Sequence, residues 1–523
     1  MQETKQAEIP SQQVPLKHWL IILGTIIGAF MAILDIQITS SSIKEIAGAL
    51  SIPVDQSSNI STAYLIAELI CISLTAWLVR AFSLKRTLIY SIVIFMIASL
   101  ACSCAWNLSS MIIFRALQGF AGAPLIPLAL SVVMRFLPKE KQMTGIAIFG
   151  LTATLAPTLG PTIGGWITDN LSWKYLFYIN IFPSVVALIM IGVHLDKQPV
   201  NTKVFTQINI FAVILIAIGL GTLEYVLENG STYNWFDSNH IIVLSIIAFI
   251  SLSLFFVVDT NSQHPLIKLQ LFTSKKFTLG CINYFLLGIM LYGSVFITPL
   301  YLVLIHQYSS MEIGLVFFWQ GFPQLICMPL IPLISKYVDS RILVIAGYLI
   351  LAASFLLIDM DPDYSGQQMK FTMLVRGIGL PFTIVPLSSV VLFDIEAKNM
   401  DDAASITSIM RNLGGALGVA IITTLIIHGR NAGTKTLSAY LPLTKIGAIE
   451  WLRNTEQLLI QQGADSHTAS LQAHALLMEQ MRMNATIIAF NDIYFLLGIL
   501  LLGCSLSILA FFDWSKLFKY YRY

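Results

Sequence analysis

Long, nearly uncharged apolar segments recur along the whole chain, and they constrain the fold more than any other feature. A helix crosses the hydrocarbon core in about 20 residues, and in lipid only helices or closed barrels satisfy their own backbone hydrogen bonds. The alternating ten-residue strands of a barrel are absent, so the sequence predicts an all-α integral membrane protein with fourteen spanning helices. These runs lie near residues 18–38, 58–79, 87–105, 109–134, 143–167, 175–194, 206–227, 239–258, 277–303, 312–334, 341–358, 369–392, 402–428 and 488–512.

The composition agrees with a membrane-embedded chain. Hydrophobic residues make up 56% of the 523 residues and charged residues 11%, whereas soluble domains carry about 25% charged residues. The formal net charge is only +2, which argues against a nucleic-acid partner. All six cysteines fall inside apolar runs, so the sequence predicts neither a disulfide framework nor a metal site.

The distribution of Lys and Arg predicts the orientation, because these residues accumulate in cytoplasmic loops. With the N-terminus inside, 19 of the 30 basic residues lie in inside segments and three in short outside loops. The stretch before the first span does not resemble a signal peptide, so we expect that helix to be retained. The predicted orientation places both tails, at residues 1–17 and 513–523, in the cytoplasm.

Two similar sequence patterns stand eight spans apart. Arg115-Ala-Leu-Gln118-Gly119 and Arg376-Gly377 each precede a proline in the same run, and a charged loop and a Gly-rich helix follow each. Transporters commonly contain such repeats, with the substrate site between the halves. The predicted domains are a six-helix bundle at 18–194, two inserted helices at 206–258, a second six-helix bundle at 277–512, and a periplasmic loop at 429–487.

The long loop at 429–487 contains a stretch from Ile449 to Met483 without proline and with a composition that permits a helix. Two interpretations remain open. The stretch forms a surface helix that caps the outer face, or it serves as a docking element for a periplasmic partner.

Six charged residues lie inside predicted spans and need a physical reason. An unpaired charge costs about 2.5–3.5 kcal/mol on the insertion scale, so six would cost about 15–20 kcal/mol. That exceeds the usual stability of a domain, about 5–15 kcal/mol. These residues must be paired, hydrated or neutralised, which in membranes indicates a pathway for ions or substrate. They are Asp35, Glu68, Arg115, Glu224, Arg376 and Arg411.

Asp35 and Glu68 are candidate sites for a proton or a cationic ligand, and Arg115, beside Gln118, is a candidate to tune them. Each has a plainer alternative. Asp35 would be an ordinary boundary residue near the headgroups, Glu68 a static partner of an arginine, and Arg115 a fixed structural clamp.

Three further charges are less central in their spans. Glu224 shares a helix face with Glu228 and is a coupling candidate or an interface residue. Arg376 and Arg411 lie near the starts of their runs, where they are secondary candidates for coupling or side chains that snorkel to the interface.

The fifth span carries a pattern typical of a moving helix. Ala156, Gly160 and Gly164 form a stripe of small residues that allows close helix packing, and Pro157 and Pro161 bend the axis. We therefore assign Gly160, Pro161, Gly164 and Gly165 to a conformational motif. No phosphate-binding loop, metalloprotease helix or nucleophile elbow is present. The sequence thus predicts no enzyme and no cofactor, with energy supplied by a proton gradient.

These motifs resemble a known family. Arg115-x-x-Gln118-Gly119, Gly160-Pro161-x-x-Gly164-Gly165 and the segment 173–183 are similar to motifs of the major facilitator superfamily. More narrowly, the chain resembles the fourteen-helix drug:proton antiporters of the EmrB/QacA type. The resemblance implies two six-helix bundles, alternating access, and proton-driven export of hydrophobic, often cationic compounds. It also implies a membrane-fusion adaptor and an outer-membrane channel as partners.

The resemblance assigns Asp35 to the family's acidic position in helix 1, Arg115 to its helix 4 arginine, and Gly160-Pro161 to its antiporter helix. The sequence departs from the family's usual pattern at three places, and these differences bear on the identity of the substrate rather than on the fold. Residues 36–44 are more polar than usual, the loop after the second span keeps only the basic end of its motif, and Glu224 stands where Gln is frequent.

The leading hypothesis is proton-driven export of amphipathic drugs or toxic compounds. One alternative is a dedicated exporter of a single endogenous metabolite such as a siderophore, for which Arg115 or Arg411 would contact an anionic ligand. A non-transporting scaffold or sensor is the alternative from another class, which the intramembrane charges disfavour.

Overall fold

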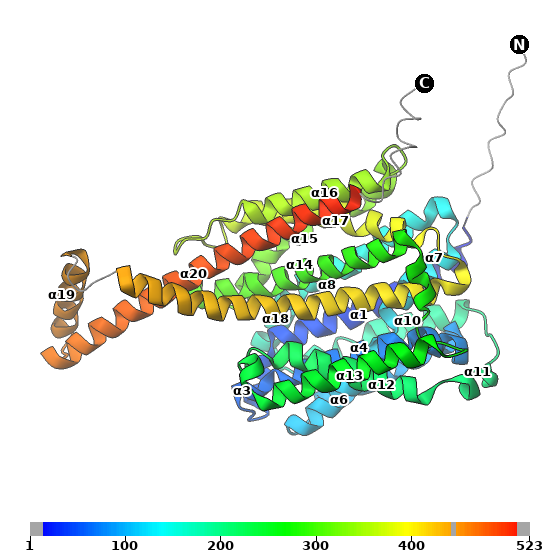
Figure 1. Ribbon diagram of the computed structural model, residues 1–523, viewed down its shortest axis with the longest axis horizontal. Coiled ribbons are helices and arrows are strands. Elements are labelled where there is room, and N and C mark those ends of the chain that lie inside the picture. The colour runs from blue at the N-terminus through cyan, green and yellow to red at the C-terminus, as the bar shows by residue number, and fades with distance from the viewer. Residues whose placement is uncertain (1–13, 441–445, 510–523) are drawn as a thin grey trace, which may run out of the picture.

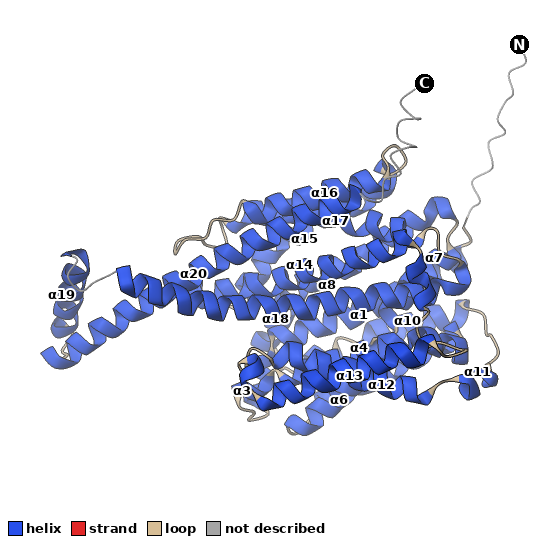
Figure 2. Cartoon of the chain, viewed as in Figure 1, coloured by secondary structure: helices blue, strands red, loops and turns tan. Residues whose placement is uncertain are grey.

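The computed structural model describes residues 14–440 and 446–509, and within them the chain forms only helices and connecting loops (Figures 1 and 2). The first bundle comprises α1 (Leu16–Ser41), α2 (Ile43–Ala49), α3 (Val54–Ser57), α4 (Asn59–Phe82), α5 (Leu84–Ser103), α6 (Leu108–Gly122), α7 (Leu125–Phe136), α8 (Lys139–Asn170), α9 (Tyr175–Tyr178) and α10 (Ile181–His194). An inserted group follows, with α11 (Thr202–Gln207), α12 (Ile210–Asn229) and α13 (Asn239–Thr260). The second bundle comprises α14 (Lys275–His306), α15 (Ser310–Ile334), α16 (Ser340–Leu356), α17 (Met369–Leu392), α18 (Met400–Tyr440), α19 (Ile446–Gln461) and α20 (Ser466–Leu509).

The helices account for every predicted span. Within the described residues, thirteen helical segments are long and apolar enough to cross a membrane, and the apolar helix α16 falls just below that length with 17 residues. Each of the fourteen predicted runs coincides with one of these segments, and residues 510–512 of the last run, 488–512, lie outside the described residues. The predicted all-α membrane fold is therefore confirmed.

Two of the predicted runs are interrupted rather than continuous. The run at 109–134 breaks between α6 and α7, where Pro124 has no N–H to donate to the carbonyl one turn earlier. The run at 175–194 breaks between α9 and α10, and Pro183 leaves the carbonyl of Ile179 without its helical donor. By contrast, α8 continues through Pro157 and Pro161.

In each bundle a glycine lets two helices of that bundle approach closely. A Cβ at Gly119 would lie 2.3 Å from the Tyr64 carbonyl oxygen, so α6 rests directly on the backbone of α4. In the second bundle a Cβ at Gly377 would lie 2.2 Å from the Gln320 carbonyl oxygen, which brings α17 onto α15 in the same way. Small residues permit this close packing, which drives helix association in lipid.

The inserted helices contact both bundles. Gly221 of α12 faces Ile66 and Ile70 of α4 at ordinary van der Waals distance. At the far end of α12, Trp235 donates a 2.8 Å hydrogen bond through Nε1 to the Thr424 hydroxyl of α18. Figure 1 shows α12 and α13 lying against the side of the first bundle.

Between the last two spans, the stretch from Ile449 to Met483 does not form one continuous helix. Instead α18 continues to Tyr440 and α20 begins at Ser466, so these two helices project past the bundle, and α19 packs against α20 (Figure 1). The stretch divides at Gly463, whose φ of 101° is left-handed and is accessible to glycine without strain. Asp465 then accepts backbone N–H bonds from the first turn of α20.

Candidate functional site

A buried polar network in the first bundle is centred on Asp35 of α1. Arg115 of α6 donates from Nη1 to Asp35 Oδ2 at 2.5 Å. Gln118, one turn along α6, donates to Asp35 Oδ1 at 2.9 Å and accepts from Arg115 Nη1 at 2.7 Å. Asn180, at the break before α10, donates to the same Oδ1 at 2.6 Å. Both carboxylate oxygens are therefore bonded.

The burial of this network decides between the interpretations of Asp35. The side chains of Asp35 and Arg115 are both 0% exposed, so Asp35 is not a boundary residue in contact with the headgroup region. The Arg115 guanidinium also lies over the Tyr64 ring, 4.4 Å from its centroid. A buried ion pair needs such additional bonds to offset the loss of hydration. Arg115 Nε and Nη2 have no hydrogen-bond partner among the described residues, so the network satisfies the carboxylate fully and the guanidinium only in part.

The sequence analysis did not single out Asn180 as a member of this network. The sequence could have indicated Asn180 as a candidate, because an amide side chain inside the apolar run 175–194 needs a hydrogen-bond partner. Its position at the α9–α10 break points its side chain back toward α1, where it bonds Asp35.

A second polar cluster lies between the two bundles. Asn412 of α18 donates to Glu68 Oε1 of α4 at 3.5 Å, and the Tyr292 hydroxyl of α14 donates to Asn412 Oδ1 at 3.4 Å. Arg411 lies within electrostatic range of Glu68, and so does Glu224 of α12. The structure thus brings Glu68, Glu224 and Arg411 together from α4, the inserted α12 and α18.

Both carboxyl groups in this second cluster are buried, and that of Glu224 is incompletely hydrogen-bonded. Glu68 is 2% exposed and Glu224 is 4% exposed, so Glu224 is not an interface residue. The Oε2 atom of Glu224 has no hydrogen-bond partner among the described residues. Tyr64 connects the two clusters, since it stacks under Arg115 and lies one turn before Glu68 on α4.

Arg376 of α17 belongs to neither cluster. Its side chain is fully buried, so it does not snorkel to a surface. The guanidinium carbon lies 4.2 Å from the ring centroid of Phe355 in α16 and 5.7 Å from that of Tyr494 in α20.

The four residues of the conformational motif face two different helices. A Cβ at Gly160 would lie 2.4 Å from Gln37 Cβ, and one at Gly164 would lie 3.0 Å from the Ile38 carbonyl oxygen, so both glycines face α1. Gly165 faces Ser310 of α15 in the second bundle. Pro161 is buried between these contacts. The motif therefore lies where α8 meets α1 on one side and α15 on the other.

Ion pairs join the bundles at the end where α1 begins. Asp402, at the start of α18, accepts from Arg80 of α4 at 2.8 Å and pairs with Lys268 at 3.0 Å. The neighbouring Asp401 pairs with Arg135 of α7. The sequence analysis used these basic residues only to orient the chain. Asp401 and Asp402, two adjacent acidic residues in the sequence, could have indicated that some of these basic residues form ion pairs.

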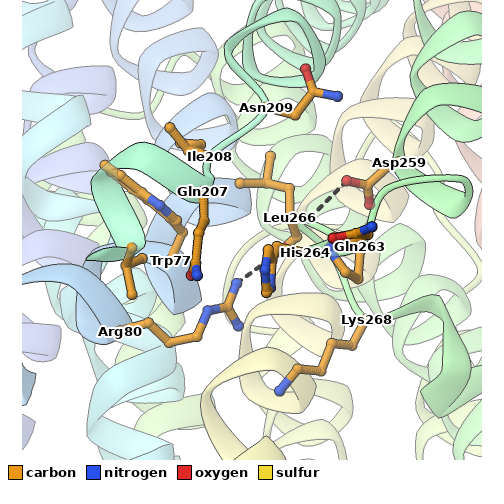
Figure 3. A pocket seen from close by; sticks show the side chains of 12 residues that line it. Trp77, Arg80, Gln207, Ile208, Asn209, Asp259, Gln263, His264, Leu266 and Lys268 are labelled. Atoms are coloured by element: carbon orange, nitrogen blue, oxygen red, sulfur yellow. Dashed lines mark hydrogen bonds between the residues drawn. The ribbon is translucent and has the colours of Figure 1, made fainter. Parts of the chain in front are cut away.

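A cavity of about 220 Å³ lies beside these ion pairs (Figure 3). Trp77 and Arg80 of α4 line it together with His264 and Lys268 from the segment after α13. Arg80 Nη2 donates to the Leu266 carbonyl at its edge. No group of three or more His, Cys, Asp or Glu side chains in the described part of the chain is arranged to hold a metal ion.

Two helical bundles with buried charges define a multi-pass membrane protein with the fold of a transporter. The fold resembles the solved structure of the proton:xylose symporter XylE, with a TM-score of 0.58 at 11% identity, covering 95% of this chain and 96% of that one. The family model described as Major Facilitator Superfamily matches residues 25–419. The chain belongs to this superfamily.

Similar proteins place the chain more narrowly. The "Colistin resistance protein EmrB" of Acinetobacter baumannii is 30% identical over 496 residues, which cover 92% of this chain and 94% of that protein. The "Multidrug export protein EmrB" of Escherichia coli is 29% identical over 419 residues, covering 79% and 82%. The chain is therefore a member of the EmrB-type multidrug efflux family, a family of transporters with small-molecule substrates.

Proposed function

We propose that this chain exports hydrophobic or amphipathic toxic compounds across the bacterial inner membrane in exchange for protons, by alternating access. The names of its relatives, which refer to multidrug export and colistin resistance, support this substrate class. The intramembrane charges support a coupled pathway rather than a passive scaffold.

The observation that carries the proposal is the position of Glu68. It sits on α4 of the first bundle and accepts a hydrogen bond from Asn412 on α18 of the second. Any rocking of one bundle against the other changes this contact. A carboxyl group at such a junction exchanges its partner when the halves separate, and a proton or a cationic group then takes the place of the lost donor.

The charge count in the cluster explains the exchange. Glu68 lies within electrostatic range of both the Arg411 guanidinium and the Glu224 carboxyl group. One negative charge is left over when both carboxyl groups are ionised. A proton or the cationic centre of a substrate neutralises it, and the two compete for the same carboxyl. Substrate binds from the cytoplasm to the deprotonated site, and a proton entering from outside displaces it.

The ends of the bundle provide the two gates. The pairs that Asp401 and Asp402 form with α4, α7 and Lys268 close the cytoplasmic end. At the opposite end α8 packs on α15, where Gly314 faces Thr162 and Gly165 faces Ser310. Opening one side requires one of these contacts to separate, with α8 as the helix that moves.

The proton gradient supplies enough free energy for useful accumulation. When a monovalent cation is exchanged for one proton no net charge moves, so the pH gradient drives its export. For a neutral substrate, moving one proton through 100 mV is worth about 2.3 kcal/mol, which corresponds to roughly fiftyfold accumulation at one proton per substrate. A pH gradient adds to this value.

Substrate-induced proton release tests the proposal. In proteoliposomes containing the full chain, a fluorescent amphipathic cation is added and the release of protons and the uptake of the cation are followed together. We expect Glu68→Gln to abolish proton release and uphill transport, and Glu68→Asp to retain part of both. Glu479→Gln, at an exposed position on α20, is the matched control and should behave as wild type. Uphill transport that persists in the presence of a protonophore would refute proton coupling.

We further propose that both termini are cytoplasmic, so that the projecting part of α18, α19 and α20 lies in the periplasm. There it would dock a membrane-fusion adaptor that leads to an outer-membrane channel. Deleting residues 446–461, which form α19, should leave vesicle transport intact and abolish drug resistance in cells. Unchanged resistance would exclude α19 as the docking element.

A further inference from the structure

The cavity of about 220 Å³ at the end where α1 begins is rich in hydrogen-bond donors. Figure 3 shows the side chains of Arg80, Gln207 and His264 pointing toward one another from α4, α11 and the segment after α13. Lys268, from that same segment, adds an ammonium group to the lining. Two of these four side chains carry a permanent positive charge, so the lining favours an anionic ligand.

The carboxylate of this lining is occupied by backbone groups. Asp259 is the one acidic residue among the described lining residues. Its two oxygens accept backbone N–H bonds from Leu266 at 2.7 Å and from Ile267 at 3.2 Å. Asp259 therefore fixes the segment that carries Lys268. In the described structure the ion pairs of Arg80 and Lys268 are formed with Asp402 of α18 instead.

Both cations retain donors for a further acceptor. Arg80 donates to Asp402 at 2.8 Å from Nη1, and its Nη2 makes only a long bond of 3.3 Å to the Leu266 carbonyl. Lys268 donates to Asn399 at 2.9 Å and pairs with Asp402 at 3.0 Å. A guanidinium has five N–H donors and an ammonium group has three. The two side chains are 32% and 30% exposed, so a ligand that enters the cavity can reach both.

The shared carboxylate and the two cations belong to different moving parts. Asp402 is on α18 of the second bundle, whereas Arg80 is on α4 of the first. The bond from Arg80 to the Leu266 carbonyl ties α4 to the segment that carries Lys268. When the end that these ion pairs close is opened, as the proposed alternating access requires, Asp402 leaves with α18. Arg80 and Lys268 then stay together without their carboxylate.

We propose that the phosphate group of an anionic phospholipid binds in this cavity and takes the place of Asp402 on Arg80 and Lys268 when this end opens. Phosphate oxygens accept charge-assisted hydrogen bonds from a guanidinium, often in pairs. Basic pockets between spanning helices at the cytoplasmic face bind anionic headgroups. The effect on opening rests on the proposed function, whereas the binding site itself does not.

The apolar surface beside the cavity favours a lipid as the source of the phosphate. Ile210 and Phe211, which directly follow lining residues at the start of α12, are 67% and 54% exposed. Phe256 and Val257, in the last turn of α13 before Asp259, are 50% and 59% exposed. Acyl chains cover such a surface while the headgroup occupies the cavity. A soluble phosphate ester has the same head chemistry but leaves this surface uncovered.

Ligand-dependent thermal unfolding of the full chain tests the site. The protein is purified in a nonionic detergent, and its unfolding midpoint is measured against increasing dioctanoyl phosphatidylglycerol, dioctanoyl phosphatidylcholine or glycerol phosphate. Phosphatidylcholine has the same chains and a phosphate whose charge is offset by choline, and glycerol phosphate has no chains. The variants are Arg80→Gln, Lys268→Gln and Asp402→Asn. Lys336→Gln, which removes an exposed lysine between α15 and α16, is the matched control.

We expect phosphatidylglycerol to raise the midpoint of wild type saturably, and the other two compounds to give no comparable increase. Because a hydrogen bond to a charged group is lost, Arg80→Gln and Lys268→Gln should each weaken binding about tenfold. Asp402→Asn removes the competing carboxylate, so it should strengthen binding, whereas Lys336→Gln should bind as wild type does. In wild type, phosphatidylglycerol should lower protection from hydrogen exchange across residues 400–403, because Asp402 loses both partners.

Distinct results would overturn each part of the assignment. Equal shifts with the two lipids would reveal binding of the acyl chains alone, and this comparison needs no variant. A full shift with glycerol phosphate would make soluble phosphate esters the ligand instead of a lipid. Undiminished binding by Arg80→Gln and Lys268→Gln would place the anion elsewhere. Binding that Asp402→Asn does not strengthen, or that leaves residues 400–403 unchanged, would exclude replacement of Asp402. The assay uses neither a drug nor a gradient, so its failure would leave proton release at Glu68 untouched.

Discussion

The Asp35–Arg115 pair permits a quantitative test of how buried charges hold this fold together. Asp35 accepts hydrogen bonds from Arg115, Gln118 and Asn180, and its side chain is 0% exposed. Asparagine at position 35 keeps one oxygen acceptor but replaces the other oxygen with an NH₂ group. That NH₂ group is a donor and would face the N–H donors that now bind the carboxylate. Removing one partner from a buried ion pair costs about 3–5 kcal/mol, because the remaining charge is left uncompensated.

The pair of substitutions should be far from additive. Asp35→Asn leaves a guanidinium that cannot be neutralised, whereas Arg115→Gln leaves a carboxyl group that can accept a proton. We therefore expect Asp35→Asn to be the more destabilising single change. The double variant Asp35→Asn/Arg115→Gln contains two neutral amides, and its loss of stability should be smaller than the sum of the two single losses by about 0.5–3 kcal/mol, the range of coupling between residues in contact.

Thermal unfolding in detergent, followed by tryptophan fluorescence and by size-exclusion chromatography, supplies the measurement. The control is Asp196→Asn, which removes an exposed ion pair with Lys17 and should leave the midpoint unchanged. Changes at Asp35 and Arg115 that add within about 0.5 kcal/mol would refute the argument, since additivity is the behaviour of sites without contact.

Further predictions concern backbone geometry and one exposed carboxyl group. Ser83 connects α4 to α5 with a φ of 81° and a ψ of 156°, a backbone conformation that only glycine adopts freely. Ser83→Gly should therefore raise the free energy of unfolding by about 1 kcal/mol. Thermal denaturation measures this change, and a lower unfolding midpoint would contradict the reasoning. Gly119→Ala should destabilise the chain markedly because its Cβ would lie 2.3 Å from a carbonyl oxygen of α4, whereas Gly192→Ala, with nothing within 4 Å, should be neutral or stabilising. Hydrogen bonds from Thr468 and backbone N–H groups hold the pKa of Asp465 below its usual value. Its contribution to the start of α20 is therefore complete above that usual value and is lost as pH falls through the lowered pKa. Protection from hydrogen exchange across 466–470, after correction for the intrinsic pH dependence of amide exchange, should fall there, and protection that does not change with pH would exclude a capping role.

Much of the fold could be predicted from the sequence because lipid leaves the backbone little choice. Each apolar run near 20 residues must form a helix, since no water is present to bond free backbone groups. The interruptions were less visible. Pro124 and Pro183 break their runs, whereas Pro157 and Pro161 lie within a continuous α8. Whether a proline interrupts a helix depends on how neighbouring helices and side chains satisfy the freed carbonyl.

The sequence also indicated which residues matter, because a charge inside an apolar run is conspicuous at any position. It did not indicate which charges meet. Asp35 and Arg115 are 80 residues apart, and Glu68 and Asn412 are 344 apart. Asn180 and the acids of α18 entered the site only when helices from distant parts of the chain were placed side by side.

The length and polarity of each segment are properties of the chain itself, and they determined that this protein is a membrane-spanning bundle with costly internal charges. The pairing of those charges depends on the rotation and depth of each helix relative to its neighbours. Helical periodicity specifies which residues share one face of a helix, but it does not specify which neighbouring helix packs against that face. For that reason only the packed structure decided that Arg115 is neutralised by Asp35 and that Arg376 has no described carboxylate beside it.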